Sequence, residues 1–115
     1  MKGKTMLETN IQGCICTNSN REIVAKWRGD IERSLGSLDL SFFDGQKISV
    51  ELKFWINTNR LRTRRNDLDN LVKPVLDSMK KIGMITDDAE IFHLDVTKFP
   101  TTGEEEIKLV VKEWN

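Results

Sequence analysis

The stretch KISVELKFWIN, residues 47–57, constrains the fold more than any other part of the chain, because its side chains divide cleanly between two faces. Successive side chains of a β-strand point to opposite sides of the sheet. One set of alternating residues is wholly apolar: Ile48, Val50, Leu52, Phe54 and Ile56. The other set is mostly polar: Lys47, Ser49, Glu51, Lys53 and Trp55. The alternation predicts a strand with one buried face and one solvated face.

A first helix is predicted before this strand. Ser19 and Glu22 have the spacing of a capping box, in which each side chain satisfies an amide at the helix start. Apolar residues then recur at helical spacing: Ile23, Val24, Trp27, Ile31 and Leu35. Gly36 follows them and can end the helix. We expect Trp27 to lie in the core.

A second helix is predicted after the strand, over residues 69–82, with Gly83 as its terminator. Its apolar stripe consists of Leu68, Leu71, Val72, Val75, Met79 and Ile82. Proline lacks an N–H and is best tolerated in the first turn of a helix. If Asp69 caps this helix, Pro74 lies just past the first turn, so we expect an irregular helix start.

Three further extended segments complete the pattern. Residues 5–16 are predicted to be extended, residues 91–99 to be a strand with Phe92, Leu94 and Val96 inward, and a last strand to bury Ile107, Leu109 and Val111. The segment FPTTGEE between the last two strands suggests a hairpin connection. The element order β-α-β-α-β-β favours an α+β fold, with two helices packed on one mixed sheet.

The chain has 115 residues, which fits a single small domain over residues 1–115. It has no run of 18 apolar residues and its N-terminus has no apolar signal core, so we expect a cytoplasmic protein with no membrane contact. Cys14 and Cys16 are two residues apart, a spacing that seldom suits a disulfide, and we expect reduced thiols. The lone His93 is expected on the surface.

The distribution of charge is more informative than its sum, because 18 basic residues balance 18 acidic ones. Four arginines stand within six positions: Arg60, Arg62, Arg64 and Arg65. Asp67 and Asp69 follow directly, at the predicted boundary between a strand and a helix. Asp87 and Asp88 lie in the loop after that helix. A local basic block beside paired carboxylates suits a polyanionic substrate and a metal ion.

Convergence of Asp67, Asp69 and Asp88 would make a site for a hard divalent cation, because crowded carboxylates repel one another until a cation relieves them. Oxygen ligands suit Mg²⁺ or Mn²⁺ and argue against zinc. Phosphodiester hydrolysis follows naturally, with the metal activating water and the arginines holding the phosphate backbone. The second helix is about 20 Å long, so the strand after it has to carry Asp88 back toward the first pair.

Simpler interpretations of the same residues stay open. An aspartate before a helix is commonly an N-cap, an arginine-rich loop is commonly a solvated face, and Asp87 with Asp88 suits an ordinary turn. Asp69 and Lys73 are four residues apart and could form a plain surface ion pair.

The segment RTRRNDLDNLVKPVLDSMKKIGMITDDAEI, residues 62–91, resembles the signature region of the RusA-type Holliday junction resolvases. The matching features are the arginine-rich lead, DLDN, a lysine four residues after the second aspartate, an apolar helix, a glycine and then DD. The resemblance implies a Mg²⁺-dependent endodeoxyribonuclease, with Mn²⁺ as a possible substitute, that resolves four-way DNA junctions by paired nicks. It also implies a homodimer with one active site per subunit, in the cytoplasm of a bacterial or phage-infected cell.

The resemblance also implies residue roles. Asp67, Asp69 and Asp88 would be metal ligands, with Asp87 supporting or sharing the third position. Lys73 would lie beside the scissile phosphate and stabilise developing negative charge. The arginines and Lys73 would contact junction DNA. A module of the same fold that binds nucleic acid without cutting is the alternative. An EF-hand Ca²⁺ loop is discounted because Val72 and Ser78 stand where it would need Gly and Glu.

Overall fold

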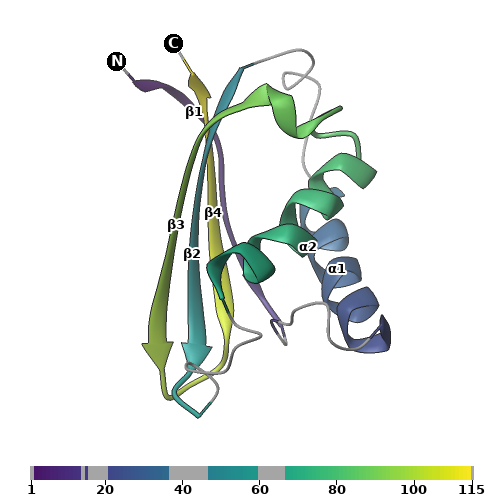
Figure 1. Ribbon diagram of the computed structural model, residues 1–115, viewed down its shortest axis with the longest axis vertical. Helices are drawn as coiled ribbons and strands as arrows, with labels where there is room; N and C mark the ends of the chain where they lie inside the picture. The colour runs from purple at the N-terminus through teal and green to yellow at the C-terminus, as the bar shows by residue number, and fades with distance from the viewer. Residues whose placement is uncertain (1, 14, 16–20, 37–46, 60–66, 115) are drawn as a thin grey trace.

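The computed structural model describes residues 2–13, 15, 21–36, 47–59 and 67–114 (Figure 1). The elements are β1 (Lys2–Gln12), α1 (Arg21–Gly36), β2 (Ile48–Asn57), α2 (Leu68–Lys81), the 3₁₀ turn η3 (Asp88–Glu90), β3 (Ile91–Thr101) and β4 (Glu106–Trp114). This order confirms the predicted β-α-β-α-β-β arrangement. Cys14, Cys16, Ser19 and the four arginines at 60, 62, 64 and 65 lie outside the described residues.

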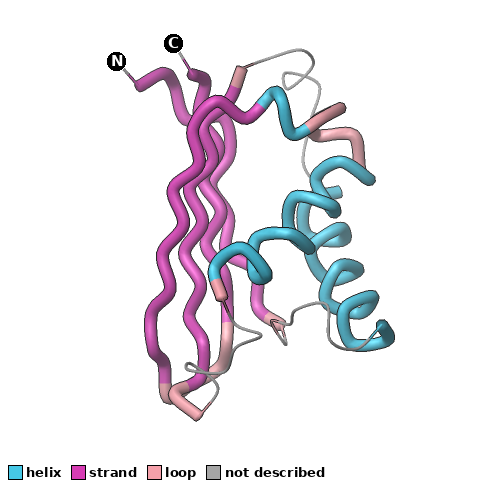
Figure 2. The backbone as a smooth tube through the Cα atoms, viewed as in Figure 1, coloured by secondary structure: helices cyan, strands magenta, loops and turns pink. Residues whose placement is uncertain are grey.

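The four strands form one mixed sheet in the order β1-β4-β2-β3. β2 and β3 are parallel and are joined through α2, whereas β4 is antiparallel to both β1 and β2. Both helices lie on the same side of the sheet (Figures 1 and 2). The predicted α+β layer arrangement is therefore confirmed. None of the helices in the described ranges is long and apolar enough to span a membrane.

The predicted hairpin between β3 and β4 is wrong. Among the described strands, β4 pairs with β1 and β2, while β3 lies at the sheet edge and pairs only with β2. The connection instead crosses the end of β2, where Thr58 N donates to Thr101 O at 3.0 Å and Asn57 N donates to Glu105 Oε2 at 2.8 Å. A turn-forming sequence signals a reversal of direction, but it does not specify which strand the returning chain pairs with.

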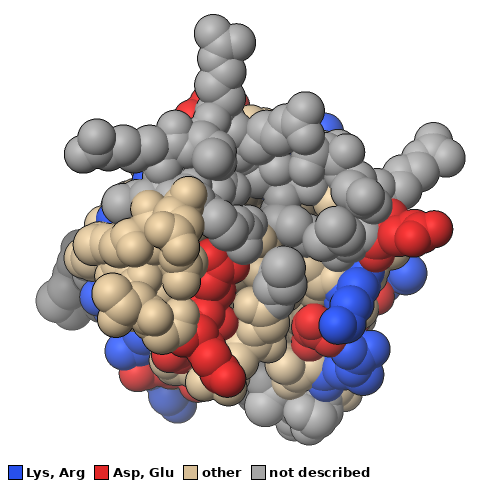
Figure 3. Space-filling view, turned by 90° about the horizontal axis from the view of Figure 1, so that it is seen from below, with Lys and Arg blue, Asp and Glu red and all other residues tan. Residues whose placement is uncertain are grey.

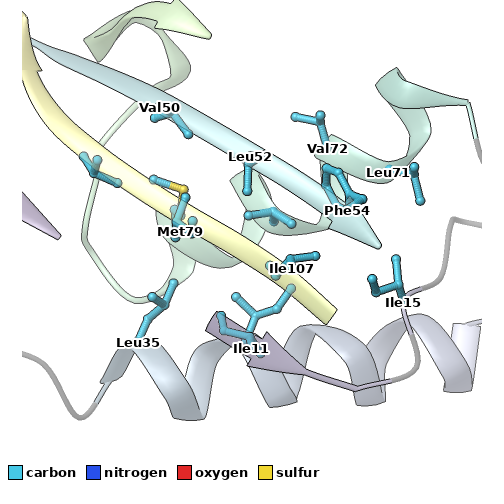
Figure 4. Packing of buried hydrophobic residues seen from close by; sticks show 14 of the residues in the cluster. Ile11, Ile15, Leu35, Val50, Leu52, Phe54, Leu71, Val72, Met79 and Ile107 are labelled. Carbon is cyan, nitrogen blue, oxygen red and sulfur yellow. The ribbon is translucent and has the colours of Figure 1, made fainter. Parts of the chain in front are cut away.

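The core lies between the sheet and the helices (Figure 4). All five apolar residues predicted for the buried face of β2 are at most 1% exposed, as are Ile107, Leu109 and Val111 of β4. From the helices, the fully buried side chains include Trp27, Ile31, Leu35, Leu71, Val75 and Met79. These residues confirm the predicted strand alternation and the main part of each helical stripe.

Three apolar residues predicted to be buried are exposed instead: Leu68 by 41%, Phe92 by 52% and Leu94 by 44%. β3 is an edge strand, so its apolar residues have a neighbouring strand on one side only. Leu68 of α2 and Leu94 of β3 both line an open groove that runs between these two elements. Ile82 and Val96 are half-buried and pack against the core.

The sequence predicted the C-terminal end of α2 better than its N-terminal end. The N-cap is Asp67 rather than Asp69, so Pro74 lies inside the helix, where it is buried. Its missing N–H removes the bond that would reach the Asn70 carbonyl. At the other end Gly83 has φ +84°, and its N–H donates to Lys80 O at 3.1 Å. A glycine at such a left-handed position ends a helix at little steric cost, as predicted.

His93 is less exposed than predicted. Its Nδ1 lies 2.9 Å from Oγ of the buried Ser49, and its ring stacks on Trp114 with centroids 5.4 Å apart. Trp55 likewise stacks on Phe99 at 5.4 Å. On the face of the sheet that carries no helix, these aromatic side chains therefore pack against one another.

Candidate active site

A groove of about 480 Å³ runs between α2 and β3. Its lining consists of Leu68, Asp69, Val72, Lys73, Leu76, Asp77, Lys80, Asp88, Leu94 and Val96. Three residues predicted for the active site, Asp69, Lys73 and Asp88, are therefore on one surface. Apolar side chains line the groove together with these charged groups.

Helical geometry explains how α2 builds its side of the groove. Residues three or four apart on a helix share a face. Asp69, Lys73, Asp77 and Lys80 follow that spacing and all line the groove, whereas Leu71, Val75 and Met79 point into the core. The same periodicity that buries one face of α2 thus presents alternating acidic and basic groups on another.

Asp69 and Lys73 are both exposed. Among the residues that the structure describes, neither takes part in an ion pair. The plain surface pair considered from the sequence is therefore not formed. Within the described part of the chain, the Lys73 ammonium is therefore open to an anion and the Asp69 carboxylate to a cation.

Asp67 occupies the N-cap position of α2, with φ −65° and ψ 150°. Its side chain makes no capping hydrogen bond, and it is exposed. It does not line the groove. Asp67 and Asp69 nevertheless both stand at the positive end of the α2 dipole, which favours ionised carboxylates there.

The two aspartates after α2 have different environments. Asp87 Oδ1 accepts a hydrogen bond from Ala89 N at 3.0 Å and so caps the turn η3. Asp88 lines the groove, and its Oδ1 lies 3.5 Å from Nζ of Lys80. The turn interpretation of the DD pair therefore holds for Asp87, while Asp88 is the member that faces the groove.

Asp77 and Lys80 were not predicted as site residues. Lys80 Nζ lies 3.8 Å from Asp77 Oδ1 as well as near Asp88. Both residues continue the helical spacing of Asp69 and Lys73, and this spacing is the sequence signal that could have identified them. Their contacts make Lys80 the cation shared by two carboxylates of the groove.

The donor chemistry of the groove fits a hard divalent cation, because its potential ligands are carboxylate oxygens with no histidine or cysteine among them. Within the described ranges, however, no three His, Cys, Asp or Glu side chains are close enough together to hold a metal. Asp69 precedes Lys80 by eleven residues on α2, about 16 Å at 1.5 Å per residue. Since Asp88 lies beside Lys80, the two carboxylates stand toward opposite ends of the groove.

The arginine block directly precedes Asp67 in the chain, and its four arginines lie outside the described residues. Figure 3 views the end of the molecule that lies at the bottom of Figure 1. An acidic streak lies near the middle of this view, and acidic and basic side chains lie next to one another toward its right and lower-left edges. No single sign of charge covers this end of the described structure.

Comparison with known proteins adds evidence of a different kind. The family model "Endodeoxyribonuclease RusA" matches residues 10–112. Crossover junction endodeoxyribonuclease RusA of Escherichia coli (strain K12) is 33% identical over 66 residues, which are 57% of this chain and 55% of that protein. The proteins of the same name from Shigella sonnei (strain Ss046) and Enterobacteria phage 82 match with the same identity and coverage. The matched region thus spans little more than half the length of these relatives.

Proposed function

The chain belongs to the RusA endodeoxyribonuclease family, and from this premise we propose that it is a Mg²⁺-dependent, structure-selective endodeoxyribonuclease. Its substrate is branched DNA, and it resolves four-way Holliday junctions by paired phosphodiester nicks. The observation that carries the proposal is the groove that holds Asp69, Lys73 and Asp88 on one surface. The names of the matched relatives support the same activity.

In the proposed site, Asp67, Asp69 and Asp88 would be the metal ligands, and Asp87 fixes the turn that presents Asp88. Mn²⁺ substitutes for Mg²⁺ because both prefer oxygen ligands. When bound, the metal supplies an activated water and neutralises charge on the phosphate.

Lys73 has the second catalytic role. Its ammonium is exposed in the groove, one helical turn from Asp69, and makes no ion pair with a described residue. An unpaired cation of this kind can stabilise the negative charge that develops on phosphate oxygens in the transition state. We assign binding of the DNA backbone to Arg60, Arg62, Arg64 and Arg65, since phosphate contacts supply most of the affinity for DNA.

We propose a homodimer as the active form. A four-way junction has approximate two-fold symmetry, and a C2 dimer presents one site to each of two strands. DNA junctions are made in the cytoplasm of bacterial and phage-infected cells, which is the location we propose.

A module that binds branched DNA without cutting it is the second candidate. The absence of a three-ligand group among the described residues favours it. The decisive experiment compares cleavage of a labelled four-way junction with cleavage of linear duplex, each with Mg²⁺ and with EDTA. Paired, metal-dependent nicks in the junction alone support the nuclease. Tight junction binding without cleavage under Mg²⁺ or Mn²⁺ supports the binding module.

A further inference from the structure

Strand β3 forms one edge of the sheet and, among the described strands, pairs only with β2. Figure 1 shows β3 at the left margin of the sheet. Its register with β2 is regular from His93 to Thr101. Within the described structure, the N–H and C=O groups on its outer side have no partner strand, and a regular edge of this kind can pair with another strand.

The large apolar side chains that are exposed in the described structure lie at or beside this edge. Phe92 and Leu94 of β3 are 52% and 44% exposed, and Leu68, which lines the same groove as Leu94, is 41% exposed. Apolar side chains that lie together on a surface mark an interaction site. The exposure of Leu94 also means that α2 leaves the edge of the sheet uncovered.

The opposite edge of the sheet, β1, is protected. Its pairing with β4 is irregular on both sides of Thr5, and such bulges discourage pairing with a further strand. Its apolar residues Leu7 and Ile11 are buried in the core. β3 has one irregularity, beside Phe92, and then a regular stretch up to Pro100, which has no N–H to donate. Of the two edges, β3 is therefore the one open to a further strand.

We propose that a second copy of this chain pairs with β3 along this edge, β3 against β3 in antiparallel orientation, with Leu94 on the two-fold axis. The inference rests on the homodimer of the proposed function and names its interface. Antiparallel pairing of two identical strands has two-fold symmetry, so the assembly closes as a dimer. The pairing joins the two four-stranded sheets into one continuous sheet.

The side chains of β3 favour this register. With Leu94 opposite Leu94, Val96 of one copy lies opposite Phe92 of the other, so that apolar residues pair with one another. An axis at Asp95 would place two carboxylates opposite each other, which is unfavourable. An axis at Val96 would place Leu94 opposite Lys98 of the second copy. The axis at Leu94 is therefore the one that pairs like with like and avoids a clash of charge.

The same register pairs polar groups on the helix-free face of the sheet. His93 of each copy lies opposite Asp95 of the other. Nδ1 of His93 lies 2.9 Å from Ser49 Oγ, and when that hydroxyl donates, Nε2 carries the ring proton and donates to the Asp95 carboxylate. Asp95→Asn keeps an acceptor oxygen at this position, so this contact does not depend on the charge.

The arrangement of the two grooves follows from this pairing. The two-fold axis is perpendicular to the joined sheet, so the helices of both copies lie on the same face. The two grooves between α2 and β3 then lie on either side of the axis and open to that face. Two strands of one junction thus reach two sites on a single surface of the dimer.

The test is sedimentation velocity of the full chain without DNA or metal, for wild type, Leu94→Lys, Leu94→Glu and a one-to-one mixture of the two variants. Wild type is a dimer at micromolar concentration. Each variant alone is a monomer, with the dimer Kd raised roughly a hundredfold or more, because two like charges meet on the axis. The mixture regains the dimer, since unlike charges then meet. Circular dichroism confirms that each variant is folded.

Thr5→Lys and Thr5→Glu are the matched controls on the opposite edge. Thr5 is exposed on β1, so both variants remain dimers. Monomeric Thr5 variants beside dimeric Leu94 variants assign the interface to β1 and overturn the proposal. A mixture of the Leu94 variants that stays monomeric also overturns it. So does a dimeric Leu94→Glu variant, because that result places position 94 opposite Lys98 rather than opposite itself.

The outcomes separate the interface from the proposed function. A dimer that shows the expected behaviour of the variants but does not cut a four-way junction with Mg²⁺ or Mn²⁺ overturns the nuclease and leaves the interface standing. Metal-dependent junction cleavage by a wild-type chain that sediments as a monomer overturns the interface and leaves the nuclease standing.

Discussion

Asp69 and Asp88 line one groove although the whole of α2 and a turn separate them in the chain. The connection through α2 returns the chain to the sheet as β3, parallel to β2, and η3 places Asp88 at the end of the groove nearest the last turn of the helix. Lys80 pairs with Asp88, while Asp69 has no ion pair within the part of the chain that is described. Within the described residues, the two carboxylates therefore differ in that only Asp88 has a cationic partner.

Replacing Asp69 by Asn should abolish junction cleavage, with a loss of roughly a hundredfold or more, because the proposed metal site loses one ligand charge. Junction binding should persist or improve, since the site carries less negative charge toward the phosphates. Gel assays of cleavage and binding on the same labelled junction measure both effects. Asp95→Asn, an exposed carboxylate on the other side of β3, is the control and should cleave normally. Full activity in the Asp69 variant would remove this residue from the mechanism.

Lys73→Ala should reduce the single-turnover cleavage rate by roughly a hundredfold, the typical cost of losing one group that stabilises transition-state charge. Junction affinity should fall far less, because one phosphate contact among many is lost. Lys53→Ala is the matched control, as Lys53 is exposed on the helix-free face of the sheet. An unchanged rate for the Lys73 variant at saturating enzyme would exclude a catalytic role.

Replacing Arg64 and Arg65 together by Ala should weaken junction binding and flatten the dependence of log K on log salt by up to about 2. Each arginine that contacts a phosphate releases counterions, and the slope counts those contacts. Measurement of junction affinity across a salt series tests this directly. A slope identical to that of wild type would place both arginines off the DNA.

Gly83→Ala should lower the free energy of unfolding by about 1 kcal/mol, since alanine is strained in the left-handed conformation that Gly83 adopts. No atom outside its neighbours lies within 4 Å of the added Cβ, so the effect isolates backbone conformation. Gly36→Ala has the same free space without the positive φ, and it should be neutral or slightly stabilising. Urea denaturation of both variants supplies the comparison. Equal stabilities would mean that the backbone at Gly83 relaxes without cost.

The candidate site was only partly predictable. The spacing of Asp69 and Lys73 on a helix was enough to place them on one face, because helical periodicity is local. The contact between Lys80 and Asp88 was not predictable in this way, since it depends on where the turn η3 lies relative to the end of α2. The distinct role of Asp87 as the cap of that turn was likewise visible only in its hydrogen bond to Ala89.

The sequence by itself determined which segments are strands and helices and which face of β2 is buried. Periodicities of two and about 3.6 residues follow from backbone geometry alone. Only the tertiary structure decided that β4 inserts between β1 and β2, which leaves β3 at the edge and exposes Leu94 in the groove. Strand pairing joins residues far apart in the chain, and several pairings satisfy the same local pattern. The choice among them depends on how the whole sheet packs against the two helices.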